Sequence, residues 1–499
     1  MEARSRKQKN KSPQNFFLKR FAWGTLCTLM LSVVLSACSH SPNYGDNTNK
    51  IRKVFTVKII PSKTTLTPII HGGYSERSTT FSVMVSGFKN RDDVNSTWLG
   101  FTPQAGLSSV EVVEDTATES TRSFVVSVHY NGTDEFPSGA ASIRLHLNVP
   151  KGYADDNETL STQVSIRDGL TKNNPIPVNA DNIEHFNHYA NTSAGLARHY
   201  QLTETFTLPP KSPGNWTAIG RYFPDTPNPF AEAFIGSFDG NGHSISGLTI
   251  ASGNNFQGMF GIISKGAEIK NLGLKNVHVT GVAAVGGLLG ASDSDGTVHN
   301  CYVTGKVTGD GIVGGLIGMN DGGMVHDCYS TANVSTRGGN GNHVGGVVGQ
   351  NNGTVHNCYA TGSVLGFLVT GGVVGANGGT VQNCVALNSS VKQTYTEPNG
   401  LLGRVVGSNR GTKAKLSNNY ARGNMLIRYR VDANGNGGTN QNTTDTAALN
   451  QVDGESVSAA HCMLAPFWEE SMRWDFSENG SWQWDSDSSL PILKKGSGI

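Results

Sequence analysis

Three histidines at one position of a recurring phrase are the first residues of this chain that could do chemistry. His299, His326 and His356 each stand between a valine and a short Asn/Asp-Cys-Tyr sequence. If each phrase occupies one layer of a stack, the imidazoles form a column that could bind Zn²⁺ or Cu²⁺. A flat column rarely offers tetrahedral coordination, so a solvated ladder of side chains is the favoured interpretation.

The same phrase aligns two further columns. Tyr302, Tyr329 and Tyr359 would stack as exposed rings able to bind sugars or an apolar partner surface, with structural stacking as the alternative. The candidate binding surface comprises these tyrosines and the three histidines. The cysteines at the neighbouring position are expected to be buried free thiols, because parallel side chains give poor disulfide geometry. They are Cys301, Cys328, Cys358 and Cys384.

Other motifs for metal or catalytic chemistry are weak. Asp432, Asn434 and Asn436 match the first half of a calcium loop, but Thr443 stands where a bidentate Glu is needed, which favours a plain turn. His185 and His188 lie three apart on an expected helix without a third ligand. The chain has no His-Glu-x-x-His, Gly-x-Ser-x-Gly or phosphate-loop motif. We therefore expect no metal, no cofactor and no enzymatic activity.

Short strands must position these columns. A second phrase recurs at offsets of 28, 31, 26 and 32 residues, starting at Val285, Val313, Val344, Thr370 and Leu402. Both phrases are β-branched and apolar, are bounded by Gly and Asn, and are too short for a helix. A period of this length predicts stacked coils whose equivalent residues form columns at about 4.8 Å. We count about seven coils between residues 230 and 425.

The repeated polar and small residues have structural roles in this stack. Asn and Asp tolerate the left-handed backbone of a tight corner, and stacked Asn side chains bond to each other. The Asn column includes Asn300, Asn357 and Asn383, with Asp327 between the first two. Glycines are expected where a Cβ would clash between strands. These are Gly287, Gly290, Gly315, Gly318, Gly346, Gly349, Gly372 and Gly375.

These phrases resemble the GLUG motif of bacterial surface proteins. The resemblance spans residues 180–495 and includes lead-in phrases at 215–220 and 234–248 and closing phrases at 474–476 and 490–493. It implies a right-handed parallel β-helix whose N-terminal end is covered by a helix. The repeats are also similar to those of IgA-specific metallopeptidases, whose protease motif is missing here. The resemblance is specific for architecture and not for activity.

The start of the chain reads as a lipoprotein signal. Seven basic residues and one acidic residue fall within residues 1–20, residues 21–37 are uncharged, and Leu-Ser-Ala precedes Cys38. This pattern resembles the bacterial lipobox, with Cys38 becoming the lipidated N-terminus. A single membrane-spanning helix is the alternative. Ser39, rather than Asp, favours the outer membrane by resemblance to envelope sorting.

Changes in composition and in the pattern of apolar residues divide the rest of the chain into domains. The chain carries a net charge of +1, and residues 1–37 contribute +6, so the remainder is near −5 and does not favour a nucleic-acid partner. Alternating strands predict an immunoglobulin-like sandwich before the coils. The expected domains are a signal at 1–37, a lipidated tether at 38–52, the sandwich at 53–175, a capping helix with lead-in strands at 180–229, the GLUG β-helix at 230–425, and a loop with a Trp-rich closing segment at 426–499.

The sequence thus predicts an all-β, lipid-anchored, surface-exposed outer-membrane protein. Its expected function is adhesion or binding along the β-helix surface, with a host matrix protein or glycan as partner and the membrane contacted through the N-terminal lipid. A β-helix enzyme acting on polysaccharide and a structural spacer of the envelope are the two alternatives. An enzyme would need clustered carboxylates or basic residues in a groove, whereas the coil strands carry almost no Asp or Glu.

Overall fold

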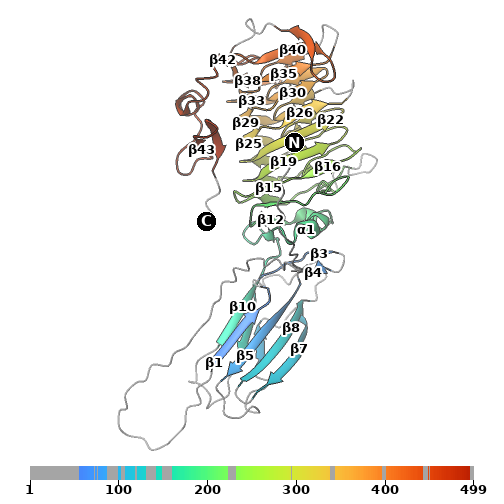
Figure 1. Cartoon of the computed structure of the whole chain (residues 1–499), viewed down its shortest axis with the longest axis vertical. Helices are drawn as coiled ribbons and strands as arrows, with labels where there is room; N and C mark the ends of the chain where they lie inside the picture. Colours follow the sequence, from blue (N-terminus) through green and yellow to red (C-terminus); the bar gives the residue numbers. More distant parts are fainter. Residues whose placement is uncertain are drawn as a thin grey trace, which may run out of the picture.

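The computed structural model places an N-terminal β-domain, a short cap and a long β-solenoid in succession along one axis (Figure 1). It describes residues 56–494 except 64, 72–73, 76, 87–98, 103–106, 119–120, 131–141, 149–159, 223–231, 294, 338–342, 396–400, 442–447 and 449. The expected signal, Cys38 and the tether lie outside the described residues.

The N-terminal domain consists of two four-stranded sheets. One has the order β1-β5-β8-β7 and the other β2-β10-β9-β6. Their bounds are β1 Thr56–Pro61, β5 Ser78–Ser86, β8 Thr121–Tyr130, β7 Leu107–Ala117, β2 Thr65–Leu66, β10 Leu160–Ile166, β9 Ser142–Leu147 and β6 Leu99–Thr102. Alternate residues are buried in both sheets, as Phe81, Val83 and Val85 in β5 and Leu145 and Leu147 in β9 illustrate. This alternation gives the predicted two-sheet sandwich.

A short helix covers the first coil of the solenoid. Helix α1 (Ile183–Tyr189) buries Ile183, Phe186 and Tyr189. Phe186 packs edge-on against Tyr200, with ring centroids 4.9 Å apart, and lies 5.8 Å from Phe238. The small hairpin β3 (Ile70–His71) and β4 (Tyr74–Ser75) belongs to the same region, beside α1 (Figure 1). The cap therefore closes an aromatic core that the first coil would otherwise expose.

The helix is shorter than the helical spacing over residues 181–200 predicts. The Thr192 hydroxyl donates to the carbonyl of Tyr189 and accepts from the Gly195 N–H, which forms a turn. A 3₁₀ turn (Gly195–Ala197) follows, and the chain then enters the solenoid as a strand. Asn182 occupies the N-cap position, but its side chain bonds to residues 177 and 179 instead of capping the helix.

The solenoid has about six turns and three sheets of mainly parallel strands. The long sheet comprises β11 Ile176–Val178, β12 His199–Leu202, β13 Phe206–Thr207, β14 Ser237–Asp239, β15 Ser244–Ser246, β16 Thr249–Ala251, β18 Glu268–Lys270, β19 Gly273–Thr280, β21 Thr297–His299, β22 Tyr302–Gly309, β25 Met324–Ser330, β26 Asn333–Thr336, β29 Thr354–Ala360, β30 Val364–Gly366, β33 Thr380–Gln382, β34 Val385–Ala386, β35 Ser390–Gln393, β38 Lys415–Ser417, β39 Tyr420–Arg422, β40 Leu426–Val431, β41 Gly437–Asn440 and β42 Glu455–Val457.

Two shorter sheets complete each coil. The six-stranded sheet comprises β17 Phe260–Ile263, β20 Leu289–Asp293, β24 Ile317–Asp321, β28 Val348–Asn351, β32 Val374–Asn377 and β37 Val406–Asn409. The four-stranded solenoid sheet comprises β23 Val313–Gly314, β27 His343–Gly345, β31 Val369–Gly371 and β36 Leu401–Gly403. A separate hairpin, β43 (Trp482–Asp485) and β44 (Leu490–Leu493), follows the coils. These bounds confirm the predicted all-β parallel solenoid.

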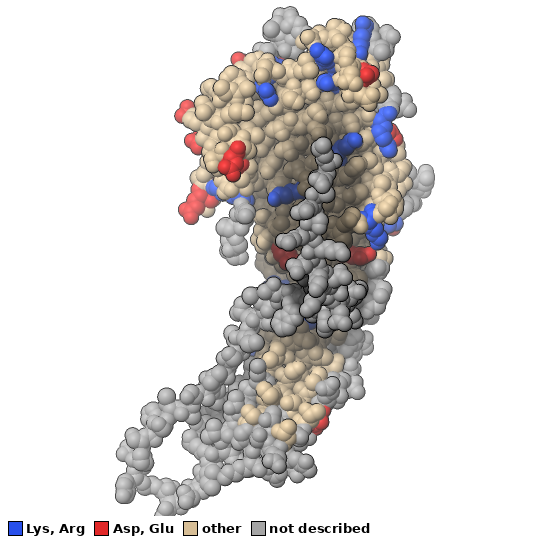
Figure 2. All heavy atoms as spheres, in the orientation of Figure 1, with Lys and Arg blue, Asp and Glu red and all other residues tan. Residues whose placement is uncertain are grey.

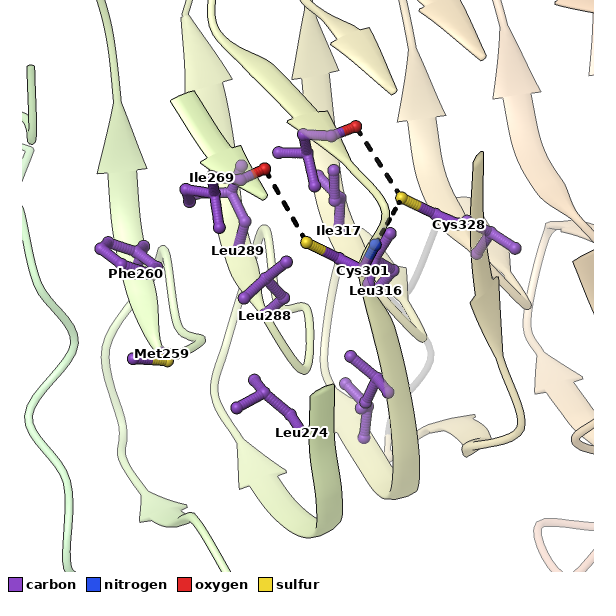
Figure 3. Close-up of a cluster of buried hydrophobic side chains, with 14 of the residues drawn as sticks. Met259, Phe260, Ile269, Leu274, Leu288, Leu289, Cys301, Leu316, Ile317 and Cys328 are labelled. Atoms are coloured by element: carbon purple, nitrogen blue, oxygen red, sulfur yellow. Dashed lines mark hydrogen bonds between the residues drawn. The ribbon is translucent and has the colours of Figure 1, made fainter. Parts of the chain in front are cut away.

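In-register stacking fills the solenoid with identical side chains. Val298, Val325, Val355 and Val381 occupy one buried register position. The four repeat cysteines are fully buried free thiols, as predicted, and the thiol of each donates to a backbone carbonyl. Figure 3 shows Cys301 and Cys328 among the leucine and isoleucine side chains of successive coils. The cysteines thus act as small core residues with a satisfied weak donor.

The predicted Asn column forms corners with a left-handed backbone. Its six residues, Asn271, Asn300, Asp327, Asn357, Asn383 and Asn418, have φ between 50° and 53°. Each amide donates to the side-chain oxygen of the preceding coil, as Asn383 does to Asn357 and Asn418 to Asn383. A second ladder, which the sequence analysis missed, runs inside the six-stranded sheet, where Asn320 donates to Asn351, Asn351 to Asn377 and Asn377 to Asn409. These bonds offset the cost of burying amides.

The repeat glycines allow coils to approach closely. A Cβ on Gly315 would overlap the carbonyl oxygen of Gly346 and the hydroxyl of Ser330. A Cβ on Gly346 would likewise overlap the carbonyl oxygen of Gly372. Glycine is required at these positions for a steric reason that the next coil imposes. The same requirement therefore applies in every coil that lies between two others.

We expect Gly315→Val to lower the free energy of unfolding by about 3 kcal/mol, because the neighbouring backbone cannot move away without breaking the stack. Met324→Ala is the matched surface change, since that side chain is 44% exposed, and should cost less than about 0.5 kcal/mol. Urea unfolding of both variants measures the difference. Equal losses would contradict the assigned packing of the glycine.

Candidate functional site

The histidine column is present but does not form a metal site. Neighbouring rings of His299, His326 and His356 lie 4.9 Å apart and within 5° of parallel. Imidazole lone pairs lie in the ring plane, so parallel rings cannot direct their nitrogens to one ion. Within the described part of the chain, no group of three or more His, Cys, Asp or Glu is arranged to hold a metal.

The His299 end of this column has an acidic neighbour. Glu268 lies 3.3 Å from Nε2 of His299, and burial lowers the pKa of His299 although this carboxylate partly offsets the effect. Burial would raise the pKa of Glu268, but Lys172, His299 and Lys270 outweigh burial and hold it at about 2. The column is therefore a partly buried ladder whose first imidazole lies next to a charged cluster.

The tyrosine column is stacked but covered. Rings of Tyr302, Tyr329 and Tyr359 lie 4.9 Å apart and within 8° of parallel. Tyr302 is partly buried, Tyr329 is 8% exposed and Tyr359 is 1% exposed. The prediction that these rings form an exposed binding surface is therefore wrong for Tyr329 and Tyr359. Repeat positions predict which face of a strand a residue occupies, but not what packs over that face.

The closing segment, residues 455–494, covers these rings. It folds back beside β25, β29 and β33 (Figure 1). Trp474 and Trp482 stack with ring centroids 4.4 Å apart, and both pack on Tyr359. Tyr359 donates its hydroxyl hydrogen to the carbonyl of Pro491, 2.9 Å away. The segment includes a π-helical turn (Phe467–Ser471), whose Phe467 and Trp468 are also buried.

Asp327 anchors the closing segment to the corner column. Its carboxylate accepts hydrogen bonds from the Trp482 indole at 3.2 Å, from the Asn357 amide at 3.0 Å and from His326 at 2.9 Å. Burial would raise the pKa of Asp327, but these donors outweigh it, so the pKa lies below its ordinary value. A carboxylate cannot donate to Asn300, whose Oδ1 is buried without a hydrogen-bond partner. The corner ladder is therefore interrupted where the closing segment binds.

The weak calcium-loop candidate, Asp432 with Asn434 and Asn436, is a hairpin turn. It joins β40 and β41, which pair antiparallel. The Asp432 carboxylate accepts the backbone N–H groups of Asn434 and Asn436 at 2.9 and 2.8 Å. This arrangement is the Asn/Gly turn that the sequence favoured. His185 and His188 line a hollow of about 710 Å³ beside α1, together with Trp216.

An open groove on the coils, which the sequence analysis did not predict, is the best candidate for a binding site. It has a volume of about 870 Å³ and runs along the corner between the six-stranded and four-stranded solenoid sheets. Gln350, Ala376 and Ser408 occupy one register position on one side, and His343, Val369 and Leu401 occupy another on the other side. Asn352, Leu368, Asn377, Gly378, Tyr395 and Arg410 complete the lining.

The floor of the groove is open where two of its side chains, Ala376 and Ser408, are small. The column that carries Gln350, Ala376 and Ser408 has Met319 in the coil before. Alanine and serine in place of methionine leave open space over two coils, with Gln350 in the coil between them and Met319. These positions differ from coil to coil, so a search for repeated residues ignores them. A change in side-chain size from one coil to the next, at a single register position, is the signal that could have located the groove.

Comparison with known proteins agrees with the coil assignment. The GLUG motif of protein families matches residues 281–308 and 340–365, and each match covers about one coil. Halomucin of Haloquadratum walsbyi is 30% identical over 222 residues, which is 44% of this chain and 2% of halomucin. The chain thus corresponds to a small fraction of that relative's length.

The molecule contains a parallel β-solenoid with a surface groove, and two stretches of its coils match the GLUG motif. Among the residues that the structure describes, no helix is long and apolar enough to cross a bilayer.

Trp482→Ala should release the closing segment, because it removes the ring that stacks on Trp474 and the donor to Asp327. We expect a loss of about 3 kcal/mol in unfolding free energy, as for other buried aromatic truncations. Limited proteolysis should then cleave within residues 455–494, and hydrogen exchange should increase around Tyr329 and Tyr359. Trp482→Phe keeps the ring and should give a smaller change. Unaltered cleavage in Trp482→Ala would refute the anchoring role.

Proposed function

We propose that this protein is a lipid-anchored cell-surface binding protein that holds an extended ligand in the groove of its solenoid. The groove is the observation that carries the proposal, because it spans three coils and combines an aromatic side chain with several polar groups. Ligand sites in proteins are typically concave, with a few polar groups that fix orientation. A stack of coils supplies such a surface without a deep pocket.

Anchoring rests on the sequence around Cys38. The basic stretch, the uncharged run and the Leu-Ser-Ala-Cys ending are typical of a lipoprotein signal. The N-terminal sandwich lies between this anchor and the solenoid in the chain. Attachment to the outer membrane, with the solenoid outward, would place the groove within reach of a matrix protein or glycan.

Binding is favoured over catalysis by the chemistry of the groove. Glycoside hydrolysis uses a pair of carboxyl groups on either side of the scissile bond. The described residues that line the groove include no Asp or Glu. A pure spacer would gain nothing from the small residues that open the floor at Ala376 and Ser408, so the groove also favours a binder over a spacer.

The anchoring proposal predicts that Cys38→Ser prevents lipid attachment, because the thiol is the acceptor of the lipid. Cells expressing the wild type should incorporate radiolabelled palmitate into this chain, and the variant should accumulate as unlabelled precursor. Normal labelling of the variant would overturn the assignment of Cys38.

The binding proposal predicts that the chain from residue 39 onward binds a member of an array of glycans and extracellular matrix proteins. Ala376→Trp fills the groove floor and should reduce that binding at least tenfold. Thr354→Trp adds the same ring on β29, in a different sheet, and should leave binding intact. Absence of any bound ligand, or full binding by Ala376→Trp, would overturn the groove as the functional site.

A further inference from the structure

We propose that the groove binds an acidic polysaccharide, a polymer of sugars that carry carboxylate groups, with Arg410 pairing to a carboxylate and Tyr395 contacting a sugar ring. The inference rests on the proposed function and specifies its ligand class. It is carried by four properties of the groove: its charge, its aromatic wall, its hydrogen-bonding groups and its direction.

The charge of the groove is positive. Arg410 is exposed, and its backbone N–H donates to the carbonyl of Asn377, which fixes the residue at the edge of the groove. Among the described residues, no carboxylate forms an ion pair with its guanidinium. Asp321, which lies three coils before Arg410 in the register of the sheet, accepts the Asn352 amide at 3.0 Å. A guanidinium matches the geometry of a carboxylate through two parallel hydrogen bonds.

The aromatic wall is held in place from behind. Tyr395 meets the ring of Phe367 edge-on, with centroids 5.2 Å apart and planes at 86°. Tyr395 is only partly buried and lines the groove. A ring fixed in this way offers a rigid amphipathic surface with little entropy to lose on binding. Such a surface suits the apolar face of a sugar ring next to a hydroxyl group.

The hydrogen-bonding groups are arranged in advance. Nδ1 of His343 donates to Oε1 of Gln350 at 2.9 Å. Burial lowers the pKa of His343, partly offset by this bond, so its ring is neutral at neutral pH. Nε2 of His343 can therefore accept a hydroxyl hydrogen, while the Gln350 amide retains donors for sugar oxygens. A neutral imidazole and a primary amide suit the hydroxyl groups of a sugar better than a second charged side chain would.

The direction of the groove favours a polymer. Its two walls follow register columns, so it runs parallel to the solenoid axis across β28, β32 and β37. Met319 occupies the floor column in the preceding coil, next to Gln350. A chain lying along the axis would contact Gln350, Ala376 and Ser408 in turn, which a single sugar could not do.

Basic side chains also occur elsewhere on the solenoid, such as Lys392 and Arg428, which occupy one register position of the long sheet. Figure 2 shows Lys and Arg side chains scattered singly over the visible face of the solenoid, with acidic side chains at its edges. Arg337, on another part of the coils, is paired with Asp310 at 2.9 Å. Removal of a positive charge outside the groove is therefore the control that separates specific binding of a polyanion in the groove from general electrostatic attraction.

The test compares polygalacturonate with the same polymer after chemical reduction of its carboxyl groups, using the chain from residue 39 onward in a calorimetric titration. We expect binding of polygalacturonate that weakens with added salt, and at least tenfold weaker binding of the reduced polymer. Arg410→Gln should weaken polygalacturonate binding about tenfold, as expected for loss of a charged hydrogen bond. Tyr395→Ala should weaken both polymers.

Lys306→Gln removes the same charge from an exposed site on β22 and should leave binding unchanged. Equal binding of the native and reduced polymers, or equal loss in Lys306→Gln and Arg410→Gln, would overturn the acidic ligand. If polygalacturonate does not bind but a neutral glycan or a matrix protein on the array does, the ligand class is wrong and the binding function stands. If nothing on the array binds, both fail.

Discussion

Everything in the solenoid depends on one constraint: each coil must present the same backbone atoms to the next coil at a spacing near 4.8 Å. The strands pair in parallel and in register from Val298 to Val325 to Val355. A residue type that packs well at one position of a coil then packs well at the same position of the neighbouring coils. A residue type that packs badly would be unfavourable in every coil that carries it. The left-handed asparagines, the crowded glycines and the buried thiols are all solutions to this constraint. Each of these features is crowded or unfavourable in a single coil and becomes favourable through contact with the same feature in the coils before and after it.

The same regularity leaves the ends and outer faces of the stack unprotected. At the N-terminal end, the aromatic core is covered by α1 through Phe186. Along the side, the closing segment covers the tyrosine column and is held by the indole of Trp482 on Asp327. Its rings form a hydrophobic cluster separate from the core of the coils. It therefore works as a brace across several coils, which resists separation of one coil from the next.

The repeats predicted the fold because they are direct evidence of stacking. The corner asparagines, the buried Cys301 column and the steric role of Gly315 all follow from it. Contacts between segments distant in sequence were not predictable in this way, which explains the error over Tyr329 and Tyr359. The second ladder, through Asn351 and Asn377, escaped notice because each Asn lies beyond the conserved phrase.

The residues of the candidate groove could not be predicted from the repeats. Its Arg410 and Tyr395 each occur once, and its floor opens where Met319 gives way to smaller residues. The predicted binding surface consisted of repeated residues, whereas a residue type that recurs in successive coils is one that the stack itself requires. In a solenoid, the positions that are free to vary between coils are the ones available for recognition.

The two asparagine ladders differ in direction. At the corner, each amide donates toward the preceding coil, as Asn418 does to Asn383, whereas inside the six-stranded sheet each donates toward the following coil, as Asn351 does to Asn377. Aligned amides add their dipoles along an axis, as peptide groups do in a helix. Because the ladders point in opposite senses, their dipoles oppose each other, and lengthening the stack need not build up a field at its ends. The partial charges that the two ladders place at one end of the stack therefore have opposite signs and partly cancel.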